Sequence, residues 1–187
     1  MILLGAPGSG KGTQGVVLAE RYDIAHISSG DILRHHIATG TPLGVTVQGF
    51  VSRGELVPDE VLIDLLQPEV IAAVEAGGYV LDGFPRSLTQ AEAAYEIAKP
   101  IGITADAVVH LAVDDDEVVR RIAARAGEGR SDDADPKIIK RRLEIYHSET
   151  QPLLDFYGER GILHTIAAAG SPDDVTEAIA KSLAHIG

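Results

Sequence analysis

The chain has 187 residues, of which 45% are hydrophobic and 24% are charged, values typical of a soluble globular protein. This length favours a single domain with a sizeable core and only short insertions. The formal net charge of −12 argues against a nucleic-acid partner, because such a partner requires a basic surface.

Three features that the sequence lacks narrow the class of protein. No apolar run approaches the roughly 18 residues that a transmembrane helix needs, and no charged segment followed by an apolar one indicates a signal peptide. The chain contains no cysteine, which excludes disulfides and thiolate metal sites. We therefore expect a cytoplasmic protein without a membrane partner.

The first expected strand is the apolar run at residues 2–4, which leads directly into G-A-P-G-S-G-K-G-T-Q at residues 5–14. Its glycines let the loop curl tightly, so that backbone N–H groups surround one point in front of the following helix. The positive end of that helix favours an anion at the same point. Lys11 adds a charge for the β- and γ-phosphates, and Thr13 adds a hydroxyl near the metal. A ligand-free glycine-rich turn is the alternative, but so long a match after an apolar strand predicts a nucleoside triphosphate site.

Four more apolar, partly β-branched runs alternate with helical patterns along the chain, at residues 24–27, 79–81, 107–113 and 162–166. Strands that are apolar on both faces and alternate with helices are typical of a parallel sheet covered on two sides. The sequence therefore predicts an α/β fold of the P-loop NTPase type. Its expected form is a doubly wound, five-stranded parallel sheet with helices on both faces.

Capping residues mark the starts of several expected helices. The pairs Thr41-Pro42, Asp135-Pro136 and Ser171-Pro172 each combine an N-cap side chain with a proline in the first turn. Residues 28–57 contain two helical patterns and no convincing strand, which indicates a small helical insert. Residues 124–134 form a short polar loop. Insertions at the carboxyl ends of strands are where such sheets bind ligands.

The motif D-G-F-P-R, at residues 82–86, follows the third expected strand. If that strand lies beside the first, Asp82 stands next to the phosphate loop and can hold the water shell of a magnesium ion. Arg86 follows a proline, which fixes its direction. The alternatives are a turn-forming aspartate and an arginine at the surface. Gln90 also fits a capping box with Ser87, so its side chain either caps a helix or binds a ligand.

The positive charge of this acidic chain is concentrated in one region. Six of the eleven arginines fall between positions 120 and 142: Arg120, Arg121, Arg125, Arg130, Arg141 and Arg142. The planar guanidinium suits phosphate oxygens. The seven histidines lack the spacing of a metal site, and there are no cysteine partners, so we expect no zinc.

Taken together, these motifs resemble the nucleoside monophosphate kinases and, among them, the adenylate kinase family. Gly12 stands between Lys11 and Thr13, and the resulting G-x-P-G-x-G-K-G-T-Q is a hallmark of that family. The resemblance covers nearly the whole chain. Its other motifs are S-S-G-D-I-L-R from Ser28, R-G-E-L-V-P-D-E from Arg53, D-G-F-P-R from Asp82, S-L-T-Q ending at Gln90, and L-E-I-Y-H-S-E-T-Q-P-L-L from Leu143.

The resemblance implies reversible transfer of the terminal phosphoryl group of ATP to AMP, giving two ADP, with Mg²⁺ and without zinc. It assigns ATP to Gly8, Ser9, Gly10, Lys11, Gly12, Thr13, Arg125 and Gly170. It assigns AMP to Ser29, Arg34, Glu55, Leu56, Val57, Gly83, Phe84, Pro85, Arg86, Gln90, Arg130 and Arg142. The catalytic residues it implies are Lys11, Arg86, Arg125, Arg130 and Arg142, with Mg²⁺ held mainly through nucleotide and water near Thr13 and Asp82. Arg121 competes with Arg125 for its role.

The expected organisation is a single kinase domain over residues 1–187. Its core comprises residues 1–27, 58–123 and 135–187, with a monophosphate-binding insert at 28–57 and a short lid at 124–134. The family favours a monomer that acts on small-molecule nucleotides. Two alternatives stay open: a UMP/CMP kinase of the same fold, although Ser29 and Gln90 favour adenine, and a nucleotide-binding switch without a small-molecule acceptor.

Overall fold

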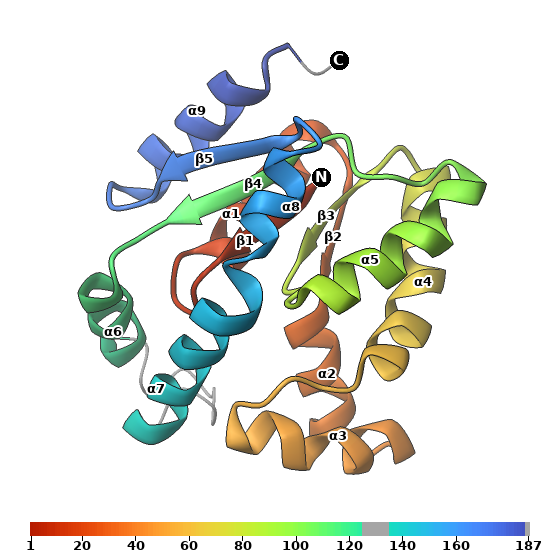
Figure 1. The fold of residues 1–187 in the computed structure, drawn as a ribbon, viewed down its shortest axis with the longest axis vertical. Coiled ribbons are helices and arrows are strands. Elements are labelled where there is room, and N and C mark those ends of the chain that lie inside the picture. The colour runs from red at the N-terminus through yellow and green to blue at the C-terminus, as the bar shows by residue number, and fades with distance from the viewer. Residues whose placement is uncertain (125–134, 186–187) are drawn as a thin grey trace.

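The structure, a computed structural model, describes residues 1–124 and 135–185 of the chain and contains the predicted five-stranded parallel sheet (Figure 1). The strand order is β2-β3-β1-β4-β5, and all four pairings are parallel. The strands are β1 (Ile2–Gly5), β2 (Ala25–Ser28), β3 (Tyr79–Asp82), β4 (Val108–Ala112) and β5 (Leu163–Ala167). Each lies within one residue of the run predicted for it.

Helices occupy most of the remaining described chain. They are α1 (Lys11–Tyr22), α2 (Ser29–Ala38), α3 (Pro42–Arg53), α4 (Asp59–Glu75), α5 (Leu88–Ala98), α6 (Asp115–Ala124), α7 (Pro136–Ile145), α8 (Leu153–Gly158) and α9 (Pro172–Leu183), with a 3₁₀ turn η1 (Lys99–Ile101) and a π-helical turn η3 (Tyr146–Thr150). The three predicted capped starts are confirmed. The side chains of Thr41, Asp135 and Ser171 each accept a hydrogen bond from a backbone N–H of the first turn.

Alternate residues of each central strand belong to different cores. Leu3 packs with Leu18 of α1 and Ile179 of α9, whereas its neighbours Ile2 and Leu4 pack in the cluster formed with α4, α5 and α8. This separation follows from the period of two along a strand, and it explains why both faces of these strands are apolar. Fully burying one such side chain contributes about 1.5–3 kcal/mol.

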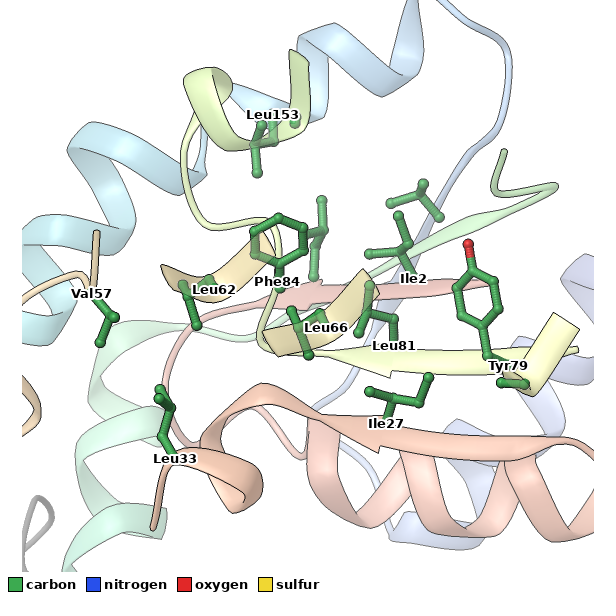
Figure 2. Packing of buried hydrophobic residues seen from close by; sticks show 14 of the residues in the cluster. Ile2, Ile27, Leu33, Val57, Leu62, Leu66, Tyr79, Leu81, Phe84 and Leu153 are labelled. Atoms are coloured by element: carbon green, nitrogen blue, oxygen red, sulfur yellow. The ribbon is translucent and has the colours of Figure 1, made fainter. Parts of the chain in front are cut away.

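The cluster that contains Ile2 and Leu4 extends to the carboxyl end of the sheet. Figure 2 shows the ring of Phe84, which follows β3, among Ile2, Leu66 and Leu153. Phe84 is only 4% exposed, so it anchors the loop that carries Arg86 to the core. In this way, packing on the sheet fixes the position of the loop after β3.

The topology brings the predicted motifs to one edge of the sheet. Strand β1 lies between β3 and β4, with Leu3 opposite Asp82 and Leu4 opposite His110. The carboxyl ends of parallel strands meet at the same edge, and ligands bind there where the strand order reverses. Ser28, at the end of β2, pairs with Asp82 and therefore lies at this edge as well.

No helix among the described residues is both long enough and apolar enough to cross a bilayer. Residues 125–134 lie outside the described part of the chain. They include most of the expected lid, with Arg125 and Arg130.

Candidate active site

One cleft at the carboxyl edge of the sheet brings together motifs that lie far apart in the sequence. Predicted site residues that line it are Gly8, Gly10, Lys11, Gly12, Thr13, Arg34, Leu56, Asp82, Gly83, Pro85, Arg86 and Arg142. A smaller cavity shares several of these residues and adds Ser29, Glu55 and Val57. The segments carrying the phosphate loop, the insert, the D-G-F-P-R motif and α7 thus form one continuous site.

The phosphate loop ends in the N-terminus of α1, whose N-cap is Gly10. Gly10 has a φ of 101°, which residues with a side chain rarely adopt, and apart from its chain neighbours no described atom lies within 4 Å of where its Cβ would be. No side chain of the described residues caps this terminus, and its first turn contains no acidic residue. The N–H groups of the first turn and the positive end of the helix dipole therefore favour an anion in the cleft.

Lys11 lies across this loop. Its Nζ donates hydrogen bonds to the carbonyl oxygens of Gly5, at 2.8 Å, and Ala6, at 2.9 Å. The backbone carbonyls of the phosphate loop thus position the ammonium group of Lys11 at the cleft. Ser9, predicted to meet ATP, is 2% exposed and does not line the cleft, and its Oγ has no hydrogen-bond partner among the described residues.

Two oxygen donors suited to magnesium face the cleft beside the loop. Asp82 is 8% exposed, and its Oδ2 lies 3.7 Å from where a Cβ on Gly12 would stand. Thr13 lines the same cleft. Carboxylate and hydroxyl oxygens suit a hard cation that keeps several waters, so these residues fit the expected ion. Among the described residues, no group of three or more His, Cys, Asp or Glu side chains is placed to hold a metal.

The opposite wall of the cleft is formed where α2 meets the loop after β3. Gly83 has a φ of 81°, and a Cβ there would lie 2.6 Å from Ser29 Oγ, so this close approach requires glycine. Arg86 Nε donates to the Gly83 carbonyl at 2.7 Å. Ser29 is 1% exposed, and its Oγ has no hydrogen-bond partner in the described part of the chain.

Two further arginines complete this wall. Arg34 pairs with Asp31 at 2.6 Å on α2, and its side chain is 29% exposed. Such partly exposed pairs contribute about 1 kcal/mol or less. The pair with Asp31 therefore holds Arg34 only weakly and leaves its guanidinium able to bind a phosphate. Arg142, on α7, has its Cγ 3.0 Å from where a Cβ on Gly54 would be. Together with Lys11 and Arg86, these side chains concentrate positive charge in a chain of net charge −12.

Gln90 does not line either cavity and is fully buried. Its Oε1 accepts a hydrogen bond from the N–H of Arg86 at 2.8 Å, and its Nε2 donates to Asp59 Oδ1 at 2.9 Å. Its own N–H donates to Ser87 Oγ at 3.2 Å, which is one half of the predicted capping box. The side chain therefore fixes the backbone of Arg86, a role that the sequence did not suggest.

Some predicted residues lie away from the cleft. Phe84 packs in the apolar core, and Gly170 lies before α9 and lines neither cavity. Arg125 and Arg130 lie in the segment without described structure.

The side chain of Arg121 lies close to the phosphate loop. Its Nη2 donates to the Ala168 carbonyl at 2.8 Å, and its Nη1 lies 3.5 Å from the Ser9 carbonyl. Its Nε donates to Glu117 at 2.7 Å, and this hydrogen bond lowers the pKa of Glu117. Arg121 thus joins α6 to the loop and to the end of β5.

Comparison with known proteins places this geometry in a family context. A family model described as adenylate kinase matches residues 3–162. The chain is 45% identical over 184 residues to adenylate kinases of Leptospira biflexa serovar Patoc and Xanthomonas euvesicatoria pv. vesicatoria, and 44% identical to that of Xanthomonas oryzae pv. oryzae. Each alignment covers 98% of both chains.

Proposed function

The chain belongs to the adenylate kinase family, and on this premise we propose that it transfers the terminal phosphoryl group of ATP reversibly to AMP, giving two ADP. The observation that carries the proposal is the single cleft. One wall is a helix N-terminus with a glycine loop, and the other presents three arginines from separate segments. Two phosphate sites that share one space are what direct transfer between two nucleotides requires.

We propose that ATP phosphates bind the backbone of Gly8–Thr13 and the Lys11 ammonium, with Arg125 and Gly170 completing the donor site as the family resemblance implies. The acceptor would bind between α2 and the loop after β3. Its phosphate would meet Arg34, Arg86, Arg142 and the lid residue Arg130, and its base would meet Ser29, the 55–57 segment and Gln90. Most described members of both sets line the cleft or the smaller cavity beside it, and this convergence supports the division, although Ser9, Gln90 and Gly170 line neither.

The acceptor is a phosphate oxygen that is already ionised at neutral pH, so no general base is needed. The protein's task is then to align the two nucleotides and to stabilise the charge on the transferring group. Alignment can supply about 7–11 kcal/mol, and arginines around the transferring group can contribute a factor of roughly 10³–10⁵ in rate. Mg²⁺ bound near Thr13 and Asp82 would neutralise phosphate charge during this step.

We further propose that the protein works as a cytoplasmic monomer, with residues 28–57 as the monophosphate-binding insert and 124–134 as a short lid. The absence of cysteine supports the proposed location, and the position of α2 and α3 beyond the sheet supports the proposed insert (Figure 1). Closure of both segments over the cleft would exclude water, which competes with AMP as the acceptor.

A panel of acceptors tests the function directly. Initial rates of ADP formation would be measured with MgATP and each of AMP, GMP, UMP and CMP, with and without excess EDTA. We expect the highest rate with AMP, loss of activity with EDTA and its recovery on adding Mg²⁺. A higher rate with UMP or CMP than with AMP would contradict the proposed acceptor and favour a UMP/CMP kinase. Binding of nucleotide without transfer to any acceptor would favour a switch.

A further inference from the structure

After α7 the chain forms one π-helical turn, η3, in which the N–H of Gln151 donates to the Tyr146 carbonyl at 2.8 Å, five residues earlier. Single π turns are rare and occur frequently at functional sites. This turn lies in the segment from Leu143 to which the family resemblance assigned no substrate contact. Three of its side chains nevertheless contact elements around the cleft: Tyr146, His147 and Thr150.

Thr150 holds the backbone of Arg86. The Thr150 side chain is buried, and its Oγ1 donates to the Arg86 carbonyl oxygen at 2.6 Å. The N–H of Arg86 is bound by Gln90 Oε1. Both backbone polar groups of Arg86 are therefore satisfied by side chains from other elements and not by a strand ladder. The position of Arg86 consequently depends on where η3 places Thr150.

Tyr146 attaches the same turn to the strand behind the phosphate loop. Its hydroxyl lies 3.0 Å from Nε2 of His110, a buried residue of β4 that pairs with Leu4 at the entrance to the loop. Burial and the charge of Lys11 lower the pKa of His110, so this imidazole stays neutral at neutral pH. Tyr146 itself lines the cleft, and its N–H donates to the Arg142 carbonyl.

His147 adds a contact from η3 to α6. Its Nε2 lies 2.9 Å from Asp115 Oδ2, and its Nδ1 lies 3.0 Å from Gln151 Oε1. This bridge is largely exposed and contributes little stability, but it joins η3 to the helix that carries Arg121. The turn thus contacts β4, α6 and the loop after β3.

We propose that Tyr146 and Thr150 are positioning residues: through η3 they hold Arg142 and Arg86 in one fixed geometry relative to the phosphate loop. This inference rests on the proposed phosphoryl transfer. The reaction depends on alignment, and a displacement of about 1 Å can cost on the order of 10²-fold in rate. A turn that contacts the backbone of both arginines and the strand behind Lys11 is placed to prevent such a displacement.

The test compares Thr150→Val, which keeps the shape of the side chain but removes the donor, with Thr150→Ser, which keeps the hydroxyl. Rates would be measured with MgATP and AMP. Thermal denaturation of each variant would give its folded fraction, and the rates would be expressed per folded molecule. We expect Thr150→Val to lower kcat about tenfold or more, with KM for AMP within about twofold of wild type. Thr150→Ser should stay within about twofold of wild type in both parameters.

Tyr146→Phe provides a second, independent variant. If Thr150→Val does not fold, the proposal is tested by Tyr146→Phe alone. Its matched control is Ser182→Ala, which removes another hydroxyl–histidine contact, 2.6 Å from Ser182 Oγ to His164 Nδ1, outside the cleft. We expect a lower kcat for Tyr146→Phe and an unchanged kcat for the control. A lower melting temperature with unchanged kcat in both η3 variants would overturn the proposal. A wild-type chain that transfers no phosphoryl group would overturn the proposed function as well.

Discussion

The two walls of the cleft are built in different ways. The proposed donor wall is one contiguous segment, residues 5–14, in which we propose that backbone N–H groups and Lys11 bind the phosphates. The acceptor wall is assembled from three distant segments and presents side chains, those of Arg34, Arg86 and Arg142. The first wall is fixed by a strand, a turn and a helix in direct succession. The second depends on tertiary contacts that hold separate loops together.

This difference predicts how each wall responds to substitution. Damage to the donor wall should remove triphosphate binding and catalysis together, because one local structure provides both. Damage to the acceptor wall should be graded, because in the proposed complex three arginines from separate segments would share one phosphate, and replacing one would leave the other two in place.

The largest effect is expected for Lys11→Met on the donor wall. Methionine keeps an unbranched side chain, one heavy atom shorter, but loses the charge and both hydrogen bonds to the loop carbonyls. We expect kcat to fall by roughly 10³–10⁵, the range found when one cation that stabilises a transferring phosphoryl group is removed. Steady-state rates and thermal denaturation of the same sample would separate this loss from unfolding.

Lys99→Met is the matched control for that substitution. Lys99 lies in η1, with its Nζ 5.5 Å from the Tyr95 ring, and it does not line the cleft. Its rates should match those of the wild type. Equal losses in the two lysine variants, or near-normal turnover of Lys11→Met, would contradict the donor site as described.

The same contrast explains how much could be predicted from the sequence. The five strands were predictable because each is an apolar run, but β1, β2 and β3 continue into Gly5, Ser28 and Asp82. Pairing with the neighbouring strand, and not hydrophobicity, decides these last residues, so periodicity misses them. The donor wall was predictable from its glycines and lysine because all its parts are adjacent in the sequence.

The supports of the acceptor wall were not predictable in the same way. The contacts from Gln90 and Thr150 to the backbone of Arg86 join residues 4 and 64 positions apart. A capping-box pattern pointed to Gln90, although to a different bond, and no pattern distinguished Thr150 from a solvated helix residue. Such contacts depend on how the helices pack, which local sequence does not determine.

A smaller loss is expected when Arg142, on the acceptor wall, is replaced by alanine. A group that acts mainly at the transition state lowers kcat and kcat/KM together and changes KM little. We expect a loss in kcat on the order of 10²–10⁴, below or within the range for arginine fingers. The same loss is predicted for Arg130→Ala in the expected lid.

Arg120→Ala is the control for the arginine cluster. The Arg120 side chain is 75% exposed and pairs with Glu117 at 2.6 Å, a surface contact that contributes little stability. Its kinetics should be those of the wild type. If Arg120→Ala were as damaging as Arg142→Ala, the assignment of the arginines would be wrong, although the kinase function would stand.

Gln90→Ala asks whether the acceptor wall reads the base or only supports Arg86, and we expect a smaller effect on turnover than for Arg142→Ala, because Gln90 contacts Arg86 only through its backbone. The substitution leaves the N–H of Arg86 without its partner, so the free energy of unfolding should fall by about 1–3 kcal/mol. If the amide also reads adenine, KM for AMP should rise and discrimination against UMP and CMP should fall.

Asp59→Ala separates these two roles, because it removes the other partner of the Gln90 amide, at 2.9 Å, without touching the cleft. A supporting role alone predicts that both variants lose stability while the ratio of kcat/KM for AMP to that for UMP stays at the wild-type value. Base reading predicts that the ratio falls in Gln90→Ala only. Reading adenine would require the amide to exchange its bond to Asp59 for one to the base, so the acceptor wall would have to rearrange on binding. The proposed donor wall would instead bind through a backbone that is already in place.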